Sequence, residues 1–146
     1  MKEFLKTIFL ISLFVTCGKK PIKKVDERSN AKSLSNKVFL QDRVFFDFDS
    51  YELNEQALKI VKEQSVFLKS QKYIDTLVIE GHADERGTAE YNLILSKRRA
   101  DSLASALKKH GFKGHVRIIA YGKERPEIAH ASTQSQHSFN RRAVIG

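Results

Sequence analysis

The feature that most limits the possible folds is the stretch 76–110, where an apolar segment, a polar run and a long helical pattern follow one another. Residues 76–80 are Thr-Leu-Val-Ile-Glu and predict a strand. Residues 80–88 then hold two glycines and five ionisable side chains. Thr88 is a suitable N-cap for a helix that runs to about His110. The strand therefore delivers a polar cluster to a sheet edge, where ligand-binding groups usually converge.

The chain after Arg43 contains enough further segments for one domain with a single core. Strands are expected at 44–48, 73–80, 116–120 and 139–145, and a first amphipathic helix at 53–69. The stretch 122–138 is expected to be irregular. The order β-α-β-α-β-β implies an α+β fold, with a mixed four-stranded sheet and two long helices packed on one face.

The N-terminus has the anatomy of an export signal. Lys2 and Lys6 come before the uncharged stretch 7–16, which is too short for the roughly twenty residues of a transmembrane helix. Cys17, the only cysteine, follows directly and has no partner for an internal disulfide. We interpret residues 1–16 as a lipoprotein signal peptide and Cys17 as a lipidation site, although Thr16 stands where Gly or Ala is usual. A buried thiol in an uncleaved anchor is the alternative.

The net charge of +9 is concentrated next to this cysteine. Residues 17–43 hold eight Lys and Arg against three acids, whereas residues 44–146 hold sixteen against thirteen. The excess is typical of a solvated tether at 17–42, which could also rest on anionic lipid headgroups. Its last apolar run, Val38-Phe39-Leu40, could dock on the domain. The folded part has no basic face interleaved with aromatics, so we expect no nucleic-acid partner.

Several short motifs of the folded part belong together. They are Phe-Asp-Phe-Asp at 46–49, Glu-Gly-His-Ala-Asp-Glu-Arg-Gly-Thr at 80–88, Tyr-Asn at 91–92, Leu-Ser-Lys-Arg-Arg-Ala at 95–100 and Asn-Arg-Arg at 140–142. Together they closely resemble the signature of the OmpA-like peptidoglycan-binding domains, most nearly those of the peptidoglycan-associated lipoproteins of Gram-negative outer membranes. The resemblance covers about residues 43–146.

The resemblance implies that Asp84 and Arg99 hold the diamino acid of the peptidoglycan stem peptide. The free end of meso-diaminopimelate carries an ammonium and a carboxylate on one carbon. A carboxylate suits the first, and a forked guanidinium can bind the second in a bidentate pair. We expect Asp84 to be partly exposed on its loop. An internal salt bridge between Asp84 and Arg99, without ligand, is the alternative.

The other site residues come from the same motifs. The resemblance implies that Tyr91 and Asn92 line the site, although Asn92 could instead only shape the 81–88 loop. Of Asp47 and Asp49, one is expected near the stem peptide and the other at the turn into the first helix. The predicted ligand-binding set is Asp84, Arg99, Asn92, Asp47, Asp49, Ala83, His82 and Tyr91. The supporting set is Gly81 and Gly87, which permit tight turns, and Asn140 and Arg141, which brace the site loop.

The sequence favours a binding protein over an enzyme and predicts no cofactor or metal. His82 with Asp84 and Glu85, or with His110 and His115, fits no zinc spacing. Adjacent carboxylates diverge, so Asp84 and Glu85 are a poor pair for glycan hydrolysis. A secreted cell-wall-acting enzyme that uses the 80–88 loop is the alternative function.

The resemblance implies an outer-membrane lipoprotein whose domain faces the periplasm and tethers the membrane to the cell wall. Its expected partners are the peptidoglycan stem peptide, outer-membrane lipid through acylated Cys17, and Tol-type periplasmic proteins.

Overall fold

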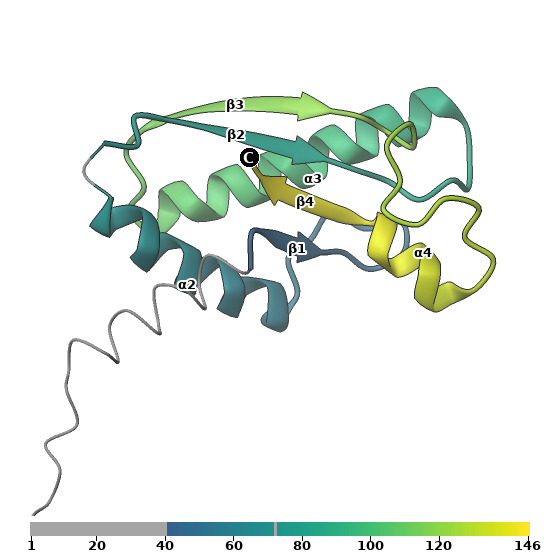
Figure 1. The fold of residues 1–146 in the computed structure, drawn as a ribbon, viewed down its shortest axis with the longest axis horizontal. Coiled ribbons are helices and arrows are strands. Elements are labelled where there is room, and N and C mark those ends of the chain that lie inside the picture. The colour runs from purple at the N-terminus through teal and green to yellow at the C-terminus, as the bar shows by residue number, and fades with distance from the viewer. Residues whose placement is uncertain (1–40, 72) are drawn as a thin grey trace, which may run out of the picture.

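The apolar segments of the sequence form one mixed sheet in the computed structural model, which describes residues 41–71 and 73–146 (Figure 1). Its strands are β1 (Arg43–Phe45), β2 (Thr76–Gly81), β3 (His115–Ala120) and β4 (Arg142–Ile145), in the order β1-β4-β2-β3. Strands β2 and β3 are parallel, and β4 runs antiparallel to both β2 and β1. The predicted mixed sheet of an α+β fold is confirmed.

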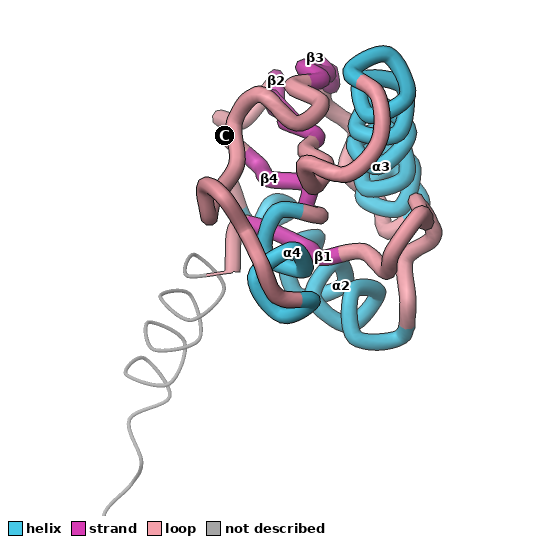
Figure 2. The backbone as a smooth tube through the Cα atoms, turned by 90° about the vertical axis from the view of Figure 1, so that its right-hand side faces the viewer, coloured by secondary structure: helices cyan, strands magenta, loops and turns pink. Residues whose placement is uncertain are grey.

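Two long helices cover one face of this sheet (Figure 2). Helix α2 (Glu55–Ser70) begins after Asn54, and α3 (Ala89–Lys109) begins after Thr88; each cap side chain accepts a backbone N–H of the first turn. Because apolar residues recur every three or four positions, each helix has one buried face. These faces and the inward side chains of the strands form the core, which includes Val44, Val61, Ile79, Leu103 and Leu107.

A third, short helix corrects the expectation for the C-terminal part. The stretch 122–138 was expected to be irregular and 139–145 to be a strand, but α4 (Gln134–Asn140) occupies the junction and β4 begins only at Arg142. The reason is a capping box, in which Thr133 and Gln136 satisfy each other's backbone N–H groups. A Thr-x-x-Gln pattern signals such a helix start, and here it outweighs the strand propensity of Phe139.

The end of β2 lies directly against α3 at Gly81. A Cβ atom placed on Gly81 would lie 1.9 Å from the backbone oxygen of Ser96, so only glycine fits there. The prediction that Gly81 permits a tight turn is therefore wrong; it permits close packing of a strand on a helix. This contact sets the 82–88 loop beside the first turns of α3.

The predicted signal peptide, Cys17 and all but the last two residues of the predicted tether lie outside the described residues. Within the described part of the chain, no helix is both long and apolar enough to cross a membrane.

Candidate functional site

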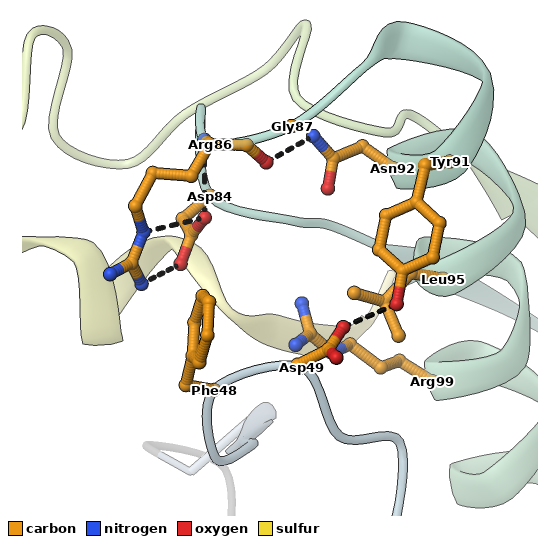
Figure 3. Close-up of a pocket in the computed structure, with 9 residues that line it drawn as sticks. All are labelled: Phe48, Asp49, Asp84, Arg86, Gly87, Tyr91, Asn92, Leu95 and Arg99. Carbon is orange, nitrogen blue, oxygen red and sulfur yellow. Dashed lines mark hydrogen bonds and ion pairs between the residues drawn. The ribbon is translucent and has the colours of Figure 1, made fainter.

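A pocket of about 370 Å³ lies where the loop after β1, the loop after β2 and the first half of α3 meet. Figure 3 shows its walls, with Asp84 and Arg86 on one side and Asp49 and Tyr91 on the other. The lining residues are Phe48, Asp49, Asp84, Arg86, Gly87, Tyr91, Asn92, Leu95 and Arg99. Five of the eight residues predicted to bind ligand are among them. The structure therefore brings together residues that are up to fifty positions apart in the sequence.

Asp84 forms one wall of the pocket and is only 4% exposed, so the expectation of a partly exposed residue is wrong. Its Oδ2 accepts from Arg86 Nη2 at 2.5 Å and from Arg141 Nη1 at 3.4 Å, and its Oδ1 accepts the Arg86 backbone N–H at 3.2 Å. Burial by itself raises the pKa of Asp84, but the hydrogen bonds and charge of Arg86 outweigh burial and hold the pKa below its ordinary value. Asp84 is therefore a carboxylate at neutral pH.

Arg99 lies at the back of the pocket with its side chain fully buried. Its Nε donates to the Ser50 carbonyl at 2.8 Å, Nη1 to the His82 carbonyl at 3.0 Å and Nη2 to the Asp47 carbonyl at 3.3 Å. Burial, together with the charge of Arg141, lowers the pKa of Arg99 to about 10. Arg99 thus ties the loop after β1 to the end of β2.

The predicted alternative, a salt bridge between Asp84 and Arg99, is not formed. The ion pairs of Asp84 in the described structure are with Arg86 and Arg141. The carboxylate and the buried guanidinium of the sequence motif therefore line one pocket without neutralising each other directly.

One side-chain hydrogen bond beside the pocket joins α3 to the loop after β1. The Tyr91 hydroxyl donates a short hydrogen bond to the Asp49 carboxylate, which raises the pKa of Tyr91 (Figure 3). Asp49 adopts the left-handed conformation, with φ of 57°. One of Asp47 and Asp49 was expected at the turn into the first helix, and the Asp47 carbonyl does accept the Ser50 N–H in a turn there. The N-cap of the helix itself is Asn54, which accepts the Ala57 N–H. Asp47 contributes through its backbone oxygen, which accepts from Ser50 and Arg99.

Asn92 both contacts the 81–88 loop and lines the pocket. Its Nδ2 donates to the Arg86 carbonyl at 2.8 Å, and its side chain is buried and lines the pocket. Gly87 adopts φ of 92°, which glycine reaches without strain, so this glycine does permit the expected turn. The reading in which Asn92 shapes the 81–88 loop is supported by this geometry.

Three predicted ligand residues, Asp47, His82 and Ala83, do not line the pocket. The His82 ring is buried behind it, with Nδ1 3.1 Å from the Arg125 carbonyl oxygen and its face stacked on Tyr121. Burial and the charge of Arg142 lower the pKa of His82 to about 4, so the ring is neutral. Ala83 is also buried. Among residues 41–71 and 73–146, no three His, Cys, Asp or Glu side chains group to hold a metal ion.

The two predicted bracing residues hold the surrounding chain. Asn140 is fully buried, and its amide exchanges two hydrogen bonds with the backbone of Ile128, at 2.9 and 2.8 Å. Arg141 donates from Nε to the Phe46 carbonyl at 2.9 Å while its Nη1 reaches Asp84. Asn140 thus fixes the loop before α4, and Arg141 fixes the wall of the pocket.

Sequence reasoning missed three side chains of the pocket, Phe48, Arg86 and Leu95. The Phe48 ring is 57% exposed, and the Arg86 guanidinium lies over it at 4.2 Å from the ring centroid. A signal was present, since Arg86 is the only cation in the 80–88 run. The Phe-Asp-Phe-Asp motif also contains more aromatics than one short strand can bury: Phe46 enters the core and Phe48 does not.

A family model and several curated relatives match this chain. The model of the OmpA family matches residues 45–141. The peptidoglycan-associated lipoprotein of Pasteurella multocida is 30% identical over 150 residues, which cover 99% of this chain and 99% of that protein. The one from Mesorhizobium japonicum is 44% identical over 108 residues, which cover 73% of this chain and 63% of that protein. The chain thus spans less than two thirds of the Mesorhizobium relative.

Solved structures share the arrangement of strands and helices. The crystal structure of the peptidoglycan-associated lipoprotein from Burkholderia pseudomallei superposes with a TM-score of 0.67 at 34% identity, over 74% of this chain and 91% of that chain. The C-terminal domain of Helicobacter pylori MotB gives a TM-score of 0.66 at 16% identity, over 72% of this chain and 82% of that chain. The second likeness concerns the fold alone.

Proposed function

The chain belongs to the OmpA family, and we propose on this basis that it binds peptidoglycan non-covalently through the pocket beside Asp84. One observation carries the proposal: a single pocket is lined by both carboxylates and guanidinium groups, together with the apolar side chains of Phe48 and Leu95. The free end of a stem-peptide diamino acid is a zwitterion, which needs an anionic and a cationic partner close together. The volume of about 370 Å³ lies in the range of small-ligand sites.

The contacts and exposure of Arg99 and Arg86 suggest that these two arginines have different roles. Arg99 already donates to three carbonyls, so we assign it to positioning the loops. Arg86 also donates from all three of its nitrogens, to Asp84 and Gln134. Unlike the fully buried Arg99, however, it is about a third exposed and stacks on Phe48, so a ligand carboxylate can reach its remaining N–H groups. Asp49 and Asp84 would then face the ligand ammonium. This assignment moves the cationic contact from Arg99 to Arg86.

The same geometry argues against hydrolysis by this pocket. A general acid needs a raised pKa so that it carries a proton near neutral pH. The pKa of Asp84 is instead lowered by Arg86. Asp49 accepts a hydrogen bond from the Tyr91 hydroxyl, so this carboxylate is held by a neighbouring side chain. These features support binding without catalysis.

Sedimentation with insoluble cell wall tests the proposal. The full chain, purified in detergent, should pellet with the wall and release no soluble fragments. Arg86→Ala should weaken pelleting, whereas Arg117→Ala, which removes an exposed arginine on β3, should not. Equal pelleting of all three proteins would refute the pocket assignment, and soluble wall fragments would favour the hydrolytic alternative.

We also propose that the chain is a lipoprotein of the outer membrane, anchored by acylated Cys17. Each buried methylene of an acyl chain contributes about 0.8 kcal/mol, so acylation gives far stronger anchoring than the lysines of the tether. A palmitate analogue should label the wild type and not Cys17→Ser, and the label should fractionate with outer membranes. An unlabelled wild type would remove the anchor from this proposal. The expected Tol-type partners stay a prediction.

A further inference from the structure

An open apolar cavity of about 300 Å³ lies at the end of the sheet away from the Asp84 pocket. It opens between the C-terminal half of α2, the start of β2 and the end of β4, which lie together on one side of the molecule in Figure 1. Leu68 and Leu77 are part of the core, and Ile74 and Ile145 are only partly buried beside them. The described residues therefore leave an apolar gap at this end of the core, where side chains lose packing contacts.

The cavity also contains a buried polar group in need of a donor. The Gln64 side chain is only 3% exposed, and its Nε2 donates to the Gln41 carbonyl at 2.6 Å. Its Oε1 has no hydrogen-bond partner among the described residues. A buried acceptor of this kind is normally paired, and a backbone N–H close to Gln41 would satisfy it.

The preceding segment of the chain starts at the rim of this cavity. Gln41 and Asp42 line it, and the Asp42 carbonyl accepts the Ile145 N–H at 2.8 Å, which fixes where the chain arrives. Consecutive Cα atoms are 3.8 Å apart, so the chain that precedes Gln41 is within reach of the cavity. Residues 38–40 are Val-Phe-Leu, the only run of three large apolar residues between positions 18 and 42.

We propose that Val38-Phe39-Leu40 docks in this cavity and completes the core, with a backbone N–H of the run bonded to Gln64 Oε1. Alternation along an extended chain places Leu40 on the same face as the buried Val44. An apolar cavity of about 150 Å³ is enough for a benzene ring, so about 300 Å³ accommodates more than one such side chain.

The docked segment would determine where the tether leaves the domain. The tether would start at the end of the sheet opposite the Asp84 pocket, so that the pocket faces away from the anchored end. The proposal goes beyond peptidoglycan binding and does not depend on it, because its test involves no cell wall.

Nuclear magnetic resonance of the full chain in detergent tests the docking directly. Nuclear Overhauser effects are expected between the Phe39 ring or Leu40 methyls and the methyls of Ile74 and Ile145. A mixture of labelled and unlabelled chains distinguishes contacts within one chain from contacts between two. Absence of these effects, or their appearance only between chains, would overturn the proposal, and the second result would identify another copy as the occupant.

A matched pair of variants tests the energetic consequence. Replacing Val38, Phe39 and Leu40 with serine should lower the melting temperature of the full chain by about 4–8 °C, the shift for roughly 1 kcal/mol in a domain of this size. The control Val25→Ser/Leu34→Ser removes apolar residues elsewhere in the segment and should leave the melting temperature unchanged. Equal melting temperatures for the triple variant and the wild type would contradict docking, as would an equal loss in the control.

Discussion

Asp84 and Arg141 are 57 residues apart in the sequence, yet Arg141 Nη1 donates to Asp84 Oδ2 at 3.4 Å, and both side chains are almost fully buried. The pair joins the loop after β2 to the start of β4. Asp84 is therefore a structural residue as well as a wall of the pocket, and its replacement should affect the fold as well as binding.

Asp84→Ala should lower the free energy of unfolding by about 3 kcal/mol, because it leaves the buried Arg141 guanidinium without its counter-charge. Urea unfolding followed by circular dichroism measures this loss. Glu85→Ala, at the exposed neighbouring position, should change stability by less than about 0.5 kcal/mol. Identical urea midpoints for Asp84→Ala and wild type would show that the ion pair contributes nothing.

Arg99→Lys should destabilise the domain although it keeps the charge. One Nζ cannot reach carbonyl oxygens in three different positions, so at least one buried or part-buried carbonyl loses its donor, at a cost of about 1–3 kcal/mol. The urea midpoint should fall, and wall binding should weaken with it. Arg98→Lys is the control, since Arg98 is exposed. An equal urea midpoint for Arg99→Lys and the wild type would mean that the positive charge of Arg99 matters and the geometry of its guanidinium group does not.

His82 should make stability fall between pH 7 and pH 5. Its pKa is about 4 in the folded protein and 6.5 ordinarily, so the unfolded chain binds a proton that the folded protein does not. The neutral His82 ring contributes fully to the free energy of unfolding above pH 6.5. This contribution is lost as the pH falls towards 4, and the loss at pH 5 is about 2 kcal/mol.

Urea unfolding of His82→Asn at both pH values isolates this contribution. The variant should show a smaller difference between pH 7 and pH 5 than the wild type, while His115→Asn, at an exposed position, should retain the full difference. A wild-type pH dependence that persists in His82→Asn would mean that another group is responsible.

Gly81→Ala should be severely destabilising, by about 3 kcal/mol or more, because the new Cβ would overlap the Ser96 backbone oxygen and force β2 away from α3. The added methyl group at Gly146 meets nothing within 4 Å, so Gly146→Ala is the matched control. Thermal unfolding of the two variants measures the contrast. A Gly81→Ala protein as stable as Gly146→Ala would show that the strand and the helix can separate at little cost.

Features that depend on neighbouring residues could be predicted from the sequence. Thr88 caps α3 as expected, and Gly87 has the positive φ of a turn. The strand before the polar run, β2, does place Asp84 just beyond its C-terminal end, at one end of the sheet. The Thr133 capping box was equally local and readable, but aromatic Phe139 together with β-branched Val144 and Ile145 suggested a strand over 139–145 instead.

The amino-acid sequence by itself determined the alternation of strands and helices. It also placed the charged groups after the strands, at one end of the sheet. Both follow from the sequence because periodicity and capping act within a few residues. Only the tertiary structure decided which charges pair. Asp84 meets Arg141 rather than Arg99, Arg99 serves three carbonyls, and Gly81 is required for packing. Such contacts join segments far apart in the chain, so their partners are settled only when the sheet and helices pack and the buried polar groups must all be satisfied.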